Sequence, residues 1–117
     1  MDKVKKLIEG YQDLMQRKQV LYSRLLSLGG ENPLQEESIY MRLEAIEEKQ
    51  VLIEDMIYDS SSLSMKESVI LDHRSTGQTL EEIGVFFAIG GERIRKILED
   101  NYQKLSIEFE EDLKQVV

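Results

Sequence analysis

Apolar residues recur at alternating steps of three and four over the first 28 residues. With one charged residue in the series, the positions are Val4, Leu7, Tyr11, Leu14, Lys18, Leu21, Leu25 and Leu28. This is the a/d pattern of a heptad repeat, and it predicts a single helix over residues 2–28. Lys18 at an a position either fixes the register of a partner helix or extends its amine to solvent at the rim of the seam.

A second helix with the same rhythm is predicted after a short break. Gly29 and Gly30 suit a left-handed helix end, and Asn32-Pro33 suits the cap and first residue of the next helix. The second series runs to about residue 58 through Ile39, Leu43, Ile46, Gln50, Ile53 and Ile57. The short connection predicts an antiparallel helical hairpin, coiled-coil-like, over residues 1–58.

The length of this hairpin raises the question of what covers its apolar stripe. Arms of about 26 residues span roughly 39 Å at 1.5 Å per residue. The stripe is therefore buried either inside the hairpin or against another chain, and we predict a role in dimerisation or in docking of a partner. The residues predicted for that interface are Leu7, Tyr11, Leu14, Leu21, Leu25, Ile46 and Ile53.

The rhythm stops at Asp59-Ser60-Ser61-Ser62, which predicts a linker over residues 59–63. Ser64 with Glu67 forms the pattern of a capping box and predicts a short helix to about Arg74. Residues 64–105 are then predicted to form a second module, and residues 106–117 an acidic tail that either continues the last helix or frays.

Within the second module, residues 79–105 have the pattern of a helix-turn-helix. Thr79 and Glu82 form another capping box, and Gly84 is small where a second helix would cross closely. The periodicity breaks over 88–91, and a second amphipathic helix follows. Such a motif places the first residues of its second helix against base edges in DNA.

The residues of this motif are similar to a known family. TLEEIG at 79–84 and ERIRKI at 92–97 resemble the C-terminal promoter-binding module (region 4) of sigma-70 family factors, whose consensus runs close to TLEEIG, a turn and T-R-E-R-I-R-Q-I. The stretch 63–74 is similar to the L-x-x-x-E-x-x-V-I-x-x-R segment before it. The resemblance covers the last third to half of the chain and implies a DNA-binding helix-turn-helix. Every upstream sigma region is missing from this sequence.

The resemblance also implies which residues meet DNA. In the family, the glutamate and second arginine of E-R-I-R help to read the promoter, so these roles fall on Glu92 and Arg95. The full set predicted for DNA contact is Thr79, Gly91, Glu92, Arg93, Arg95 and Lys96. The alternative is a solvated helix face, stabilised by Glu92–Lys96 and Arg95–Glu99 pairs. Gly90-Gly91 replaces the family's Thr-Arg, which removes a cap, a phosphate contact and a base-reading arginine.

Composition limits the function further. The net charge is −8, so the chain alone is expected to bind DNA weakly and to need a dimer or a larger partner. With no cysteine, one histidine and no catalytic constellation, we expect no enzyme, no metal or cofactor and no small-molecule substrate. No apolar run reaches membrane length, and the sequence is typical of a cytoplasmic protein.

The whole layout resembles, more loosely, the small phage-encoded activators of late transcription in Gram-positive hosts, the ArpU/RinA-like group. This implies a sequence-specific regulator that acts at a phage or mobile-element promoter with host RNA polymerase, as a homodimer. The alternative is a protein-interaction regulator that binds polymerase or a sigma factor through its hairpin with little DNA contact. Phe86 is expected to face outward, where it either packs against the preceding helix or, as a minor candidate, serves as a docking residue.

Overall fold

The computed structural model describes residues 2–116 of the chain. Within that range the chain forms seven α-helices and no strand, which confirms the predicted all-α class. The helices are α1 (Asp2–Glu9), α2 (Tyr11–Leu28), α3 (Pro33–Tyr58), α4 (Met65–Ser75), α5 (Leu80–Phe87), α6 (Gly91–Glu108) and α7 (Glu110–Gln115). None of the helices in this range is long and apolar enough to cross a membrane.

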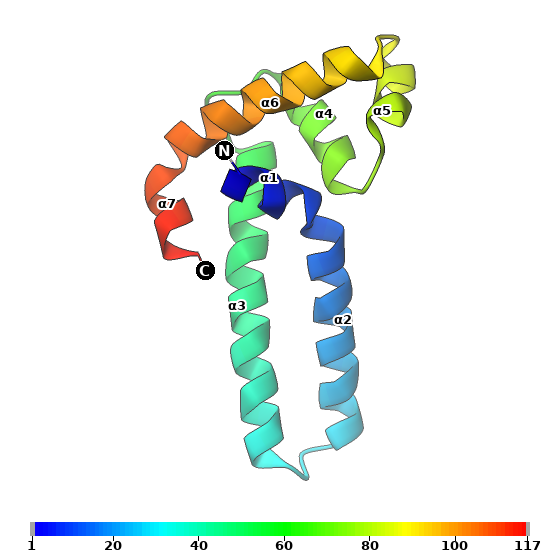
Figure 1. Cartoon of the computed structure of the whole chain (residues 1–117). Coiled ribbons are helices and arrows are strands. Elements are labelled where there is room, and N and C mark those ends of the chain that lie inside the picture. The colour runs from blue at the N-terminus through cyan, green and yellow to red at the C-terminus, as the bar shows by residue number, and fades with distance from the viewer. Residues whose placement is uncertain (1, 117) are drawn as a thin grey trace.

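The long helices α2 and α3 form the predicted antiparallel hairpin (Figure 1). Gly29 ends α2 in the left-handed region at φ 58°, where a residue with a side chain would be strained. The Asn32 side chain accepts a hydrogen bond from the Gln35 N–H at 3.3 Å, and Pro33 is the first residue of α3. The connection is therefore the turn that these residues predicted.

The single helix predicted over residues 2–28 is wrong, because the chain bends at Gly10 and forms two helices. Backbone hydrogen bonds continue through the bend, from Gly10 N–H to the Lys6 carbonyl at 2.9 Å and from Leu14 N–H to the Gly10 carbonyl at 3.0 Å. A Cβ at residue 10 would lie 2.7 Å from the Lys6 oxygen, so only glycine fits here. The bend directs α1 away from the hairpin and onto α4 and α6 (Figure 1).

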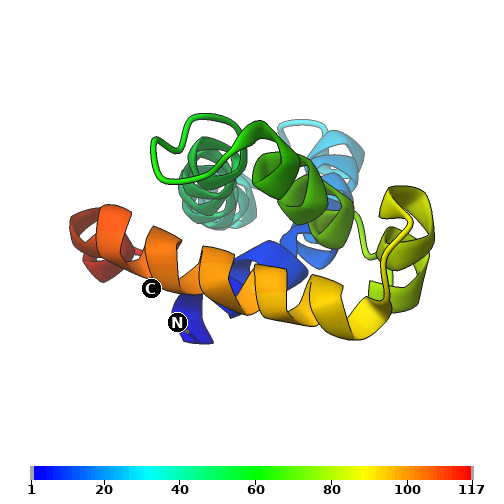
Figure 2. The ribbon, with the colours of Figure 1, turned by 90° about the horizontal axis from the view of Figure 1, so that it is seen from above.

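The core lies where α6 crosses the base of the hairpin, with α4 and α5 toward one end of α6 and α7 at the other (Figures 1 and 2). Val4 and Ile8 of α1 are fully buried there, although the heptad pattern placed Val4 along the hairpin. Further fully or nearly fully buried residues of this core come from four helices: Ile53, Met56, Ile57, Ile70, Leu71, Ile83, Ile94, Leu98, Tyr102 and Leu105.

The hairpin projects from this core and makes the molecule elongated. The Cα radius of gyration is 16.6 Å, compared with about 13 Å for a compact chain of this length. Beyond residue 105 the chain remains helical, since α6 runs to Glu108 and α7 follows with Leu113 buried. The Lys3 ammonium donates to the Leu113 carbonyl, so α7 is attached to the N-terminal helix.

Candidate nucleic-acid interface

Helix α5 begins with the predicted capping box. The Glu82 N–H donates to the Thr79 hydroxyl at 3.1 Å, and the Thr79 N–H donates to the Glu82 carboxylate at 3.0 Å. The hydrogen bond from the Thr79 backbone lowers the pKa of Glu82, which favours the ionised cap. Thr79 is exposed to solvent at the start of α5. Its side chain caps the helix, and a contact between Thr79 and DNA stays a prediction.

The turn after α5 depends on Gly84. Ala88 ends the helix in the left-handed region at φ 59°, and the Ile89 N–H donates to the Gly84 carbonyl at 2.9 Å. A Cβ at residue 84 would lie 2.5 Å from the Ile89 oxygen. Close approach at Gly84 was predicted, and the groups that approach are the backbone of the turn and the start of the second helix, with the Gly91 nitrogen 3.3 Å from a Cβ at residue 84.

Two glycines with different surroundings begin α6. Gly90 is its N-cap, makes no side-chain cap and has open space where a Cβ would be. A Cβ at residue 91, in contrast, would meet Glu81 Oε1 at 3.3 Å and the Glu81 nitrogen at 3.4 Å. Gly91, which was predicted to contact DNA, therefore lies against the first turn of α5, and Gly90 is the glycine with open space beside it.

The next residues of α6 present charge to solvent. Glu92, Arg93 and Lys96 are exposed, whereas Arg95 is half-buried between two carboxylates. The Arg95 guanidinium is bound by Glu92, with a 3.1 Å contact from Nε, and by Glu99. The predicted Arg95–Glu99 pair is confirmed, but Glu92 pairs with Arg95 rather than with Lys96.

These pairs shape the electrostatics of the helix face. The hydrogen bond from Arg95 lowers the pKa of Glu92, and the pKa of Arg95 is raised above its usual value chiefly by Glu92. Both groups are therefore charged and largely neutralise each other. Arg93 and Lys96 form no ion pair among the described residues.

A third cation, Lys66 of α4, lies beside these two. Lys66, Arg93 and Lys96 line one groove of about 380 Å³ between α4 and α6, together with Ile70 and Ile97. Two carboxylates, Glu67 and Asp100, line the same groove, and both are paired with Lys104. Lys66 was not among the residues predicted from the sequence. Lys66 could have been singled out from the sequence, because the helix dipole disfavours a cation in the first turn of a helix and Lys66 lies in such a turn.

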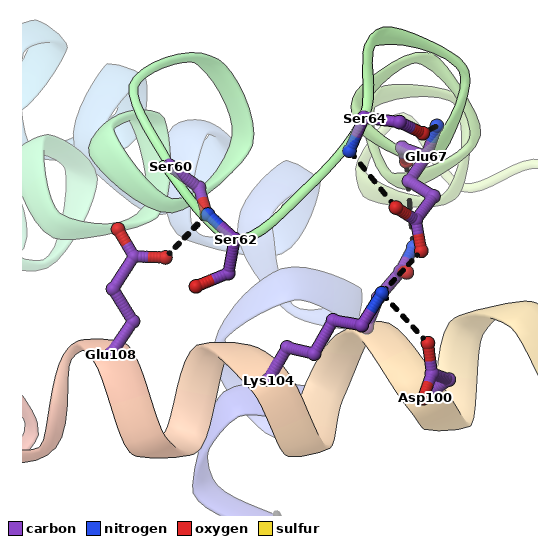
Figure 3. A network of polar contacts seen from close by, with 8 residues as sticks. Ser60, Ser62, Ser64, Glu67, Asp100, Lys104 and Glu108 are labelled. Atoms are coloured by element: carbon purple, nitrogen blue, oxygen red, sulfur yellow. Dashed lines mark hydrogen bonds and ion pairs between the residues drawn. The ribbon is translucent and has the colours of Figure 1, made fainter.

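Polar contacts fix α6 against α4 and so position its charged end. The Lys104 ammonium lies 3.0 Å from both Glu67 and Asp100 (Figure 3). When the buried Asn101 amide is assigned the orientation in which its nitrogen faces acceptors, it donates to Glu67 Oε2 at 2.8 Å and to the Ile97 carbonyl at 3.1 Å. Burial opposes ionisation of Glu67, but hydrogen bonds from Ser64 and Lys104 outweigh it and lower its pKa.

The Ser-rich segment predicted as a linker is a second attachment point for α6. The Ser60 hydroxyl donates to Glu108 at 2.5 Å, and the Ser62 N–H donates to the same carboxylate at 3.2 Å (Figure 3). The Ser61 N–H also donates to this carboxylate, at 3.0 Å. Burial raises the pKa of Glu108, but these hydrogen bonds outweigh it and lower the pKa to about 2. We call this arrangement the serine clamp; it joins the end of α3 to the end of α6.

The outer side of α5 is apolar. Val85 and Phe86 are exposed, and the Phe86 ring centroid lies 4.6 Å from that of His73. Phe87 is half-buried and packs against the core, so Phe86 is the phenylalanine that faces outward, as predicted.

The residues predicted for an interface of the hairpin lie along the α2–α3 seam and at its base. Leu14, Ile46 and Ile53 are buried there, whereas Leu7, Leu21 and Leu25 are half-buried. The Tyr11 hydroxyl donates to Glu54 at 2.8 Å on one edge of the seam. On the same edge Lys18 donates to Gln50 at 2.8 Å, so this lysine bridges the two helices.

No family model, curated protein or solved structure matches this chain.

Proposed function

We propose that this protein is a sequence-specific DNA-binding regulator of transcription, which uses α5 and α6 as a sigma region 4-like helix-turn-helix. The observation that supports this most directly is the exposed cation cluster of Lys66, Arg93 and Lys96 beside the first turns of α6. On a chain of net charge −8, three cations around the start of one helix are suited to contact DNA phosphates.

In this proposal the first turns of α6 enter the major groove. Arg93 and Lys96, which share the side of α6 that faces α4, bind phosphates there, and Glu92 accepts a hydrogen bond from a cytosine amino group. Arg95 reads a base edge only after it exchanges a carboxylate partner for that base. Its two ion pairs fix the position of the guanidinium. Because one of them must break before Arg95 binds a base, they also reduce the gain in affinity on binding.

The weak electropositive footprint is the reason for including RNA polymerase in the proposal. Three cations supply few phosphate contacts, so DNA affinity is low unless a second copy or polymerase adds contacts. We therefore propose action at a promoter together with host RNA polymerase, at a phage or mobile-element gene. The hairpin is the part we assign to association with a second copy or with the transcription machinery.

The test is a mobility-shift series on DNA from the gene's own neighbourhood, at several salt concentrations, with and without polymerase. Arg93→Ala with Lys96→Ala is expected to weaken binding and to lower the slope of log K against log salt by about one for each phosphate that is no longer neutralised. Lys114→Ala on α7 removes an exposed cation far along the chain and serves as the control. Equal binding by both variants would contradict the proposal.

A second candidate function is supported by the neutralised Arg95 and the acidic surface. In that case the protein regulates by binding polymerase or a sigma factor and scarcely contacts DNA. Arg93→Ala with Arg95→Ala distinguishes the two: it abolishes promoter binding under the first proposal and leaves partner binding unchanged under the second. A DNA complex with two copies of the chain would establish dimeric reading.

A further inference from the structure

A furrow runs along one edge of the α2–α3 seam and onto α1. It consists of two adjoining grooves of about 570 and 340 Å³. The grooves are continuous, because Asp13, Leu14, Arg17 and Lys49 line both of them. From Arg42 to Ile53 along α3 the furrow extends over 12 residues, which is about 16 Å or three helical turns.

The floor of the furrow is apolar. It is formed by the stripe that the heptad pattern identified: Leu7, Leu14, Leu21, Ile46 and Ile53. Val20 adds an exposed apolar side chain at the edge, with 60% of its surface accessible. Since α2 and α3 are only two helices of a bundle here, the furrow is the position that a third helix would occupy.

The rim of the furrow is basic in an otherwise acidic protein. Five of the chain's 15 Lys and Arg residues line it: Lys3, Lys6, Arg17, Arg42 and Lys49. Among residues 2–116, the carboxylate that lines the furrow is Asp13, which lies 3.1 Å from Arg17. The opposite edge of the seam is closed by hydrogen bonds, including Tyr22 to Glu47 at 2.9 Å and Lys18 to Gln50 at 2.8 Å.

We propose that this furrow binds an acidic amphipathic helix of another protein. An apolar stripe of about three turns would cover the leucine and isoleucine floor, and Glu or Asp residues flanking that stripe would meet the basic rim. The inference deepens the proposed function and rests on it for the partner's identity, as a component of the transcription machinery. The chemistry of recognition depends only on the furrow.

Charge distinguishes this occupant from the alternatives. Two furrows facing each other across a two-fold axis would bring ten cations and two carboxylates together, so a symmetric dimer through this face is opposed by repulsion. Placing an acidic face of a second copy in the furrow would be a head-to-tail contact that does not close. DNA would use the cations but would leave the apolar floor without a counterpart.

The experiment uses the full chain and a fluorescently labelled designed peptide of about 18 residues, long enough to include the roughly three turns that the furrow spans. The peptide carries leucine at helical spacing with glutamate flanking the stripe. Anisotropy titration is compared with two further peptides, one with the glutamates replaced by lysine and one with the leucines replaced by serine. We expect binding to the first peptide and at least about tenfold weaker binding to each of the others.

Variants of the chain locate the site. Arg17→Glu with Arg42→Glu is expected to weaken acidic-peptide binding by about tenfold and to improve binding of the lysine peptide. Lys5→Glu with Lys114→Glu makes the same charge change outside the furrow and is expected to have little effect. Val20→Ser is expected to weaken binding, whereas Val51→Ser, at an equally exposed valine outside the furrow, is not. Circular dichroism of each variant verifies its fold.

Three outcomes would overturn the inference. One is binding of the acidic peptide that does not need leucine or is unchanged in the Arg17→Glu/Arg42→Glu chain. Another is a dimer, detected by sedimentation, that these substitutions dissociate. The third is loss of promoter binding in the Arg17→Glu/Arg42→Glu chain when the unsubstituted chain does not bind the acidic peptide. Failure of the proposed function appears separately, as promoter binding that is insensitive to Arg93→Ala and Lys96→Ala while the furrow still binds peptide.

Discussion

The base and the distal half of the hairpin have the same sequence rhythm but different surroundings. At the base, Ile53, Met56 and Ile57 are at most 1% exposed, because α1, α4 and α6 cover that end of α3. In the distal half, Leu21, Leu25 and Leu28 of α2 remain half-buried, and the buried apolar residues are Ile39 and Leu43 of α3. Leu26 and Leu34 near the turn are more than 80% exposed.

This difference shows that periodicity determines which side of a helix is apolar, whereas the number of packed layers determines how much of that side is buried. Burial contributes roughly 25 cal/mol per Å² of apolar surface, so the base supplies most of the stability. Two helices alone are marginal, and the distal half is expected to open locally before the core unfolds. A partner helix in the furrow would supply the missing layer.

The largest expected effect tests the two halves directly. Ile57→Ala removes a fully buried side chain from the core and should lower the free energy of unfolding by about 2–5 kcal/mol. Leu25→Ala in the distal half should cost about 1 kcal/mol, because the side chain is already partly hydrated. Urea unfolding followed by circular dichroism measures both. Equal losses would show that the halves are equally buried in solution.

The serine clamp gives a pH-dependent prediction for the base. Because its hydrogen bonds lower the pKa of Glu108 to about 2, ionised Glu108 stabilises the fold above the unfolded-state pKa near 4.5. That contribution is lost as pH falls from about 5 toward 2. Glu108→Gln should therefore cost about 1 kcal/mol at pH 7, after allowance for solvent screening, and progressively less in acid.

Glu111→Gln is the matched control for the clamp, since its carboxylate is exposed on α7 and its contact is to Lys114 at 3.4 Å. A change within about 0.5 kcal/mol is expected for it at any pH. If both glutamine variants lost the same stability at neutral pH, the hydrogen bonds of the serine segment would not hold α6 to α3.

The smallest effect comes from replacing alanine with glycine in the turn after α5 and in α3, where opposite changes in stability are expected. Ala88→Gly in the turn should stabilise by up to about 1 kcal/mol, because Ala88 has a left-handed backbone that glycine adopts without strain. Ala45 is exposed to solvent and lies far from both ends of α3, so Ala45→Gly should destabilise the protein by about 1 kcal/mol. Thermal unfolding of both variants gives the comparison, and a loss of stability in Ala88→Gly would contradict the assigned turn.

Local chemistry made several features predictable from the sequence. Each capping box joins residues three positions apart, so Ser64 with Glu67 and Thr79 with Glu82 could be identified without any tertiary contact. The hairpin connection was equally local, since Gly29, Asn32 and Pro33 each act through their own backbone or a neighbour's. The same holds for the Arg95–Glu99 pair, one helical turn apart.

The remaining features depend on groups far apart in the chain. Gly10 permits a bend, but the burial of Val4 and Ile8 under α6 determines that the bend is used. Ser60 and Ser61 read as a linker because their acceptor, Glu108, is more than 45 residues away. The cations beside α6 and along the furrow come from separate helices as well. The sequence by itself determined the helical class, the capped helix ends and the apolar sides of the helices. Tertiary packing decided where the first helix bends, which apolar sides were covered and which charges met, because burial and Coulomb interactions depend on distance in space rather than along the chain.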